Sequence, residues 1–90
     1  MPDAETPQPP KAEFLTLVAT LAGQATIGMG LVAHPISKQI QKDLKQAKFA
    51  IDMIVVLEEK TRGNLTAEER KVLDRVLGDL RVRWLDAAKS

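Results

Sequence analysis

A chain of 90 residues with a formal net charge of +1 is long enough for one small domain, and its charge gives no bulk electrostatic reason to bind nucleic acid. It contains no cysteine and one histidine, which excludes disulfides, thiol chemistry and a histidine pair for zinc or iron. Hydrophobic residues make up 44% of the chain and aromatic residues 3%, a balance that favours packed helices over a β-sandwich.

The N-terminal segment is rich in proline and acidic in charge. Closely spaced prolines prevent a regular helix, so the sequence predicts a disordered tail over residues 1–11 and a single helical domain over residues 12–90. A secretory signal begins with positive charge before an apolar run, whereas this chain begins with Asp3 and Glu5. We therefore expect a cytoplasmic protein.

A first helix is predicted over about residues 11–31. Large side chains recur at helical spacing on one face, and the members of this face are Phe14, Val18, Leu21, Ala25, Met29 and Val32. The opposite face carries small residues instead of charges, namely Ala19, Gly23, Thr26 and Gly30. Glycine inside a helix costs about 0.5–1 kcal/mol relative to alanine. Gly23 and Gly28 therefore indicate close approach of a second helix backbone.

A second helix is predicted over about residues 37–62, with Ser37 as its N-cap, because Pro35 ends the first helix at His34. Its main apolar stripe consists of Ile40, Leu44, Ala47, Ile51 and Ile54. Beyond Lys48 a second stripe lies almost opposite the first, and it consists of Phe49, Met53 and Val56. A helix that is apolar on two faces is usually buried between neighbours. Asp52 lies between the stripes and is expected to pair with Lys48 or with an arginine of the third helix, such as Arg81.

A tight corner separates this helix from a third one, predicted over residues 67–88. Gly63 can adopt the left-handed conformation that closes a helix, because it has no Cβ. Thr66 and Glu69 have the spacing of a capping box, in which each side chain accepts the backbone N–H of the other residue. The third helix has one apolar stripe, formed by Leu73, Val76, Leu77, Leu80, Trp84 and Ala87.

The corner also carries a family resemblance. The string Glu59-Lys-Thr-Arg-Gly-Asn-Leu-Thr66 resembles a small bacterial family known as domain of unknown function 1844, as do Ile51-Asp52, the opening Phe14-Leu-Thr-Leu-Val-Ala-Thr-Leu-Ala22 and Leu77-Gly-Asp-Leu-Arg81. The resemblance runs from about Phe14 to Ala88. It implies a compact helical fold and no mechanism, since the family has no established activity. The loop Ala33-His-Pro-Ile36 departs from it by lacking a longer polar insert.

The sequence thus predicts an all-α three-helix domain with more apolar surface than three helices can cover. We expect a homo-oligomer, most simply a dimer, that acts as a structural or protein-interaction module, with an unidentified protein as a further partner. The predicted contact uses Phe49, Met53 and Val56, or Ala19, Gly23 and Gly30, or both. Alternatively, the first helix lies between the other two, with its outer face under the tail.

Other functions are less well supported by the residues. The uncharged residues 14–32 approach the length of a bilayer span, so the alternative is a membrane-associated helical protein with this segment embedded. Glu68 and Glu69 would repel phosphate at the start of a recognition helix, which argues against nucleic-acid binding. The ionisable groups do not converge on a catalytic or metal site, so we expect no enzyme activity, no metal and no cofactor.

Overall fold

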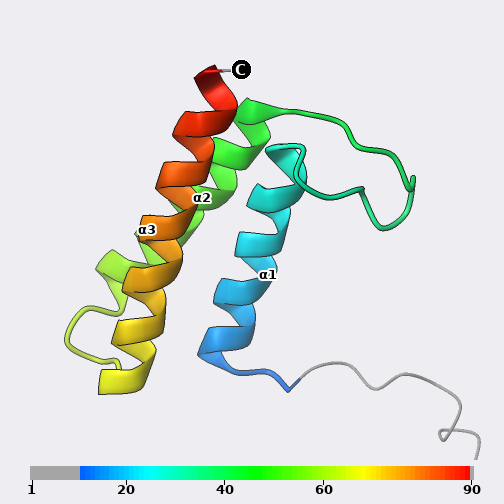
Figure 1. The fold of residues 1–90 in the computed structure, drawn as a ribbon. Helices are drawn as coiled ribbons and strands as arrows, with labels where there is room; N and C mark the ends of the chain where they lie inside the picture. Colours follow the sequence, from blue (N-terminus) through cyan, green and yellow to red (C-terminus); the bar gives the residue numbers. More distant parts are fainter. Residues whose placement is uncertain (1–10, 90) are drawn as a thin grey trace, which may run out of the picture.

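Three α-helices make up the computed structural model of the chain, which describes residues 11–89. They are α1 (Phe14–Gly28), α2 (Leu44–Lys60) and α3 (Ala67–Lys89), and each helix packs against the other two. α1 and α3 run in one direction and α2 runs in the opposite direction (Figure 1). No strand occurs in residues 11–89, which confirms the all-α three-helix fold. The predicted tail, apart from Lys11, lies outside the described residues.

The core is formed by the main apolar stripe of each helix. Its fully buried side chains with the largest volumes are Ile54, Leu73 and Val18, one from each helix. The other buried hydrophobic residues are Ala25, Met29, Ala47, Ala50, Ile51, Leu77, Leu80 and Ala87. Because these residues recur every three or four positions, each helix turns one face to the core and leaves the opposite face outside.

α1 ends at Gly28, three residues before its predicted end. Gly30 has a φ of 79°, and its N–H donates to the Ile27 carbonyl, while the Leu31 N–H donates to the Thr26 carbonyl. This pair of bonds is the Schellman arrangement, which needs a left-handed residue directly after the helix end. Placing Gly30 inside the helix is therefore wrong, because it forms the turn that closes α1.

α2 begins at Leu44, so the predicted start at Ser37 is wrong. Asp43 is the N-cap, and its Oδ1 accepts the Gln46 N–H at 3.1 Å. Upstream, the chain turns at Lys38, which has a φ of 62° that a helix does not allow. Ile40 consequently lies in the connector and is 64% exposed, rather than in the main stripe of α2.

His34 organises this connector. Its Nδ1 accepts the backbone N–H of Ile36 at 3.1 Å and that of Ser37 at 3.4 Å. Its carbonyl accepts the Lys38 N–H, and its own N–H donates to the Gln39 carbonyl. These bonds close a turn in place of the helical start predicted at Ser37. Val32, predicted to line the core face of α1, is also exposed here.

Gly28 lies where α1 and α2 come closest. A Cβ added to it would lie 2.9 Å from the Ala47 nitrogen and 3.0 Å from both the Ala47 Cβ and the Asp43 carbonyl oxygen. The Gly28 carbonyl also accepts the Asp43 N–H at 2.7 Å. Close backbone approach therefore accounts for Gly28. Gly23 differs, because no atom lies within 4 Å of its added Cβ.

The second corner and the far ends of α2 and α3 are held by specific hydrogen bonds. Gly63 has a φ of 84°. The Thr66 N–H donates to Glu69 Oε1 at 2.9 Å, and the Glu69 N–H donates to Thr66 Oγ1 at 3.1 Å, as in a capping box. At the opposite end of the pair, Trp84 Nε1 donates to the Leu44 carbonyl at 3.1 Å. The capping box thus starts α3 at the corner, and the Trp84 bond joins the end of α3 to the start of α2.

Candidate interaction surface

The outer face of α2 carries an exposed apolar stripe. Phe49, Met53 and Val56 are spaced by four and three residues, and their exposed fractions are 57%, 40% and 46%. The core residues Ala47 and Ile54 lie on the opposite side of the helix. The stripe predicted from the second hydrophobic period of this helix is therefore an outward face of the chain.

The edge of the stripe nearer α3 is charged. Lys45, Lys48, Asp52 and Glu59 all lie along it at helical spacing and are exposed. Lys48 Nζ lies 3.3 Å from Asp52 Oδ1, so Asp52 pairs with Lys48, one of the two partners expected from the sequence. Both side chains are more than half exposed, and such a pair contributes little to stability.

The edge nearer α1 is uncharged between the Asp43 cap and Lys60. Ala19 and Gly23 are exposed on the outer face of α1. Thr20 Oγ1 donates to the Thr16 carbonyl at 2.9 Å, and Thr26 Oγ1 donates to the Ala22 carbonyl at 2.8 Å. Because these hydroxyls bond within the helix, their polarity is partly satisfied without water. The α1 residues that border α2 are Gln24 and Ile27, which share a hollow with Gln46, and neither carries a charge. Ala19 and Gly23 lie farther round the outer face of α1, away from α2.

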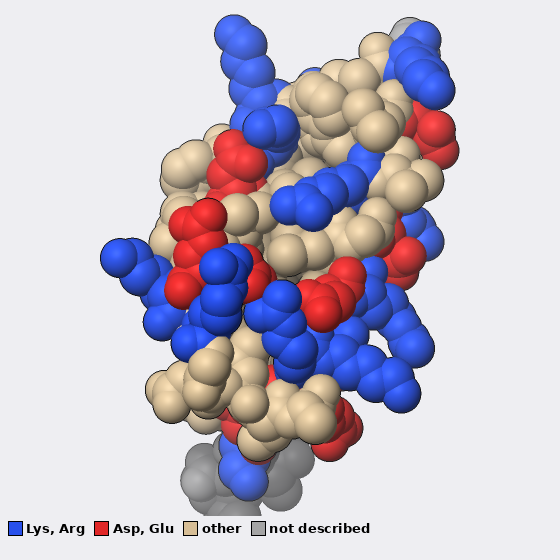
Figure 2. Space-filling model, turned by 90° about the vertical axis from the view of Figure 1, so that its left-hand side faces the viewer, with Lys and Arg blue, Asp and Glu red and all other residues tan. Residues whose placement is uncertain are grey.

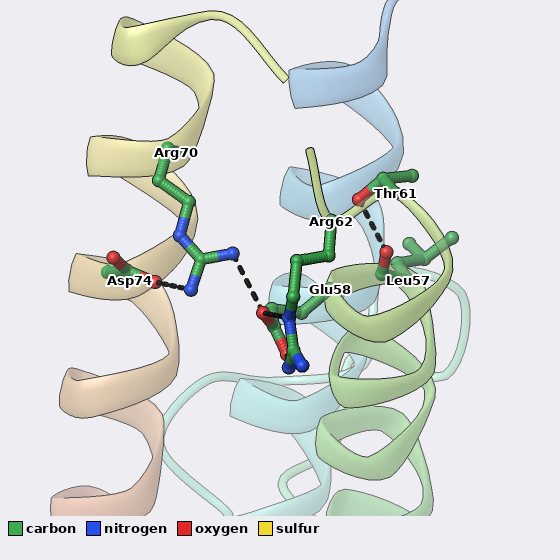
Figure 3. A network of polar contacts seen from close by, with 6 residues as sticks. All are labelled: Leu57, Glu58, Thr61, Arg62, Arg70 and Asp74. Carbon is green, nitrogen blue, oxygen red and sulfur yellow. Dashed lines mark hydrogen bonds and ion pairs between the residues drawn. The ribbon is translucent and has the colours of Figure 1, made fainter. Parts of the chain in front are cut away.

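Glu58 is the one buried charged residue within the described range, with 8% of its surface exposed. Arg62 binds it with two bonds, Nη2 to Oε1 at 2.9 Å and Nε to Oε2 at 3.1 Å. Arg70 of α3 donates from Nη1 to the same Oε2 at 2.7 Å and pairs with Asp74 at 3.3 Å (Figure 3). The network joins the end of α2 to the start of α3.

The two guanidinium groups control the ionisation of this carboxylate. Hydrogen bonds from Arg62 and Arg70 lower the pKa of Glu58 from 4.5 to about 2, against the opposing effect of burial. The same contacts raise the pKa of both arginines. A carboxylate held ionised by two guanidinium donors is a poor proton acceptor, so the network fits a structural role. Sequence reasoning placed Glu58 among the acids at the end of the second helix but did not predict its burial or its two arginine partners, although it lies four residues after the core residue Ile54.

A match to a family model decides the classification. The model described as domain of unknown function (DUF1844) matches residues 11–86, which include α1, α2 and most of α3. The chain belongs to this family. The resemblance seen in the corner and in the opening of α1 is thereby confirmed. No curated protein and no solved structure matches the chain.

The DUF1844 domain has a second apolar area, between the first half of α2 and the second half of α3. Leu85 is exposed there and lines a groove with Lys48, Ile51, Asp52, Val55, Arg81 and Trp84. Val82, three residues before Leu85, is exposed on the outer face of α3. Figure 2 views the molecule from this side. Its upper half is mostly uncharged, with one basic side chain across it and charged side chains at its borders, and a band of mixed charges lies below. The two apolar areas are thus separated by the charged edge of α2.

The polar groups near the start of α2 are engaged in local hydrogen bonds. His34 borders a hollow with Gln24, Gln41, Asp43 and Gln46, but its Nδ1 and the Asp43 carboxylate are both occupied by backbone N–H groups. Over residues 11–89, no three histidine, aspartate or glutamate side chains gather in a way that suits a metal ion. Within the same range, every helix is too short or too polar to cross a bilayer.

Proposed function

We propose that this domain is a self-associating structural module, in which the outer face of α2 packs against a second copy of the chain. The observation that carries the proposal is the exposed stripe of Phe49, Met53 and Val56. Single exposed hydrophobic residues are ordinary on protein surfaces. Three in line on one helix form a continuous apolar face, and such faces are typical of interfaces.

The size of the chain supports the same conclusion. A domain of this length removes only about 60% of its unfolded surface from water, so a second copy adds burial that one copy cannot reach. The outer face of α1 carries Ala19 and Gly23, and small residues let two backbones approach closely. This face is a second surface that self-association could cover.

No chemical step is part of the proposal. The Glu58 carboxylate is saturated by two guanidinium groups, and His34 Nδ1 accepts two backbone N–H groups. These are the groups that a catalytic role would otherwise draw on. Their bonds instead stabilise the corner and the connector.

The molar mass in solution tests the proposal. We expect light scattering after gel filtration to give a multiple of the 9.9 kDa chain mass at micromolar concentration. Phe49→Glu and Met53→Glu should each shift the species toward the single-chain mass, because a charge would be buried in the contact. Circular dichroism should show that both variants keep their helix content, since the two side chains lie outside the core.

Val82→Glu is the matched control. Val82 lies on α3, is 60% exposed and is close in exposure to Phe49, but it is not part of the stripe. It should leave the mass unchanged. A wild-type chain that stays single at high micromolar concentration would refute self-association. Dissociation by Val82→Glu alone would place the contact on the outer face of α3 instead of the α2 stripe.

A further inference from the structure

We infer that the two copies pack α2 against α2 in antiparallel directions, about a twofold axis that passes near Met53. This inference depends on the proposed self-association and specifies its geometry. It follows from the unlike edges of the stripe, one charged and one uncharged, and from the order of the charges along α2.

The two edges are distinguished by their neighbours. Lys48 and Asp52 share a groove with residues of α3, whereas Gln46 shares a hollow with Gln24 and Ile27 of α1. Viewed from outside, the stripe therefore has charges along its edge toward α3, whereas its edge toward α1 is uncharged between the Asp43 cap and Lys60. In a symmetric dimer, the orientation of the two copies determines which edge of one stripe faces which edge of the other.

Symmetry allows two face-to-face arrangements of such a stripe. A twofold axis parallel to α2 makes the helices parallel and places the charged edge of one copy on the uncharged edge of the other. A twofold axis perpendicular to α2, within the contact plane, makes the helices antiparallel and places each edge on its own kind. The parallel arrangement would remove the charged edge of each copy from water and place it against the α1 side of the other copy, where it finds no opposite charge, and this is unfavourable. The antiparallel arrangement joins the two uncharged α1 edges instead.

The order of charges fits the antiparallel arrangement. Lys45 begins the charged edge and Glu59 ends it, fourteen residues apart and thus on the same side of the helix. Their midpoint is residue 52, and the midpoint between Phe49 and Val56 falls between residues 52 and 53. One axis near Met53 therefore places Lys45 opposite Glu59 of the partner subunit, twice by symmetry, and Phe49 opposite the partner's Val56. The same axis places Asp52 opposite the partner's Asp52, and the Lys48 that pairs with each carboxylate at 3.3 Å offsets the repulsion between them.

The absence of cysteine from the chain allows a direct test. Helices in contact place facing Cα atoms within the range that a disulfide bridges. An oxidised mixture of Phe49→Cys and Val56→Cys chains should form mixed disulfides in preference to either self-linked species. Met53→Cys alone should form a covalent dimer. Preferential self-linking of Phe49→Cys and of Val56→Cys would overturn the antiparallel arrangement while leaving self-association intact.

Charge reversal provides a second test that does not need a cross-link. Glu59→Lys or Lys45→Glu should raise the dimer dissociation constant about tenfold, because each brings like charges together twice. The double variant K45E/E59K should recover wild-type affinity. Asp79→Lys, an exposed change on α3 with the same charge difference as Glu59→Lys, should have no such effect.

The outcomes separate the two proposals. A single-chain mass for the wild type refutes self-association and this geometry together. A dimer that forms no disulfide from any of the three cysteine variants, and that ignores charge reversal at both positions, uses another surface and overturns the α2 contact.

Discussion

Gly28→Ala tests the close contact that positions α1 on α2. The added Cβ would lie 2.9 Å from the Ala47 nitrogen and 3.0 Å from the Asp43 carbonyl oxygen, both of which belong to the backbone. Backbone atoms cannot rotate away, so the two helices must separate locally. The same point carries the 2.7 Å bond from the Asp43 N–H to the Gly28 carbonyl, which the separation would lengthen.

The magnitude is the balance of two effects. Overfilling a packed contact costs about 1–3 kcal/mol. Alanine recovers at most about 0.5–1 kcal/mol of helix propensity, and less at Gly28 because it is the last residue of α1. We expect the free energy of unfolding to fall by about 1–2 kcal/mol.

Urea denaturation followed by circular dichroism measures this change, at one fixed protein concentration because association would add to stability. Gly78→Ala is the matched control. Gly78 lies inside α3 with no atom within 4 Å of its added Cβ, so alanine should stabilise by about 0.5–1 kcal/mol. A Gly28→Ala chain as stable as wild type would refute the close-contact argument.

Three further predictions concern the polar contacts. The folded state lowers the pKa of Glu58, so the ionised carboxylate contributes fully to the free energy of unfolding above pH 4.5, and this contribution is lost as the pH falls to about 2. Glu58→Gln should flatten that part of a curve of stability against pH, and an unchanged curve would contradict the network. Trp84→Phe removes the donor to the Leu44 carbonyl and should cost about 0.5–1.5 kcal/mol in urea denaturation, whereas no loss would show the bond to be unimportant. Thr66→Ala should lower the free energy of unfolding by about 1 kcal/mol through loss of the α3 N-cap, and Thr66→Ser should restore most of it.

The parts of the fold that depend on short-range signals could be predicted from the sequence. The capping pattern of Thr66 and Glu69 after Gly63 marked the α2–α3 corner, and the two hydrophobic periods of α2 separated Ile54 in the core from Phe49 outside. Each of these signals lies within a few residues, where helical geometry alone determines which side chains share a face.

The start of α2 shows where that reasoning fails. Ile40 is in phase with Leu44, so periodicity extended the helix backwards, but the His34 turn and the positive φ of Lys38 prevail. The spacing of Asp43 and Gln46 carried the correct N-cap signal and could have been used. The Glu58 network was only partly within reach of local reasoning, because Arg62 lies four residues away in the chain whereas Arg70 approaches across the corner from α3.

The bond between Asp43 and Gly28 has a consequence for chain length. It ties together the two ends of the connector, so residues 31–42 form a loop that projects from the bundle and is closed at its base (Figure 1). Doubling a flexible loop costs only about 0.6 kcal/mol in closure entropy. Ile36 is the most exposed large hydrophobic residue of this loop. Extra sequence inserted near it would leave the junction of α1 and α2 in place. This makes the connector a suitable position for a peptide tag that must not disturb the helices.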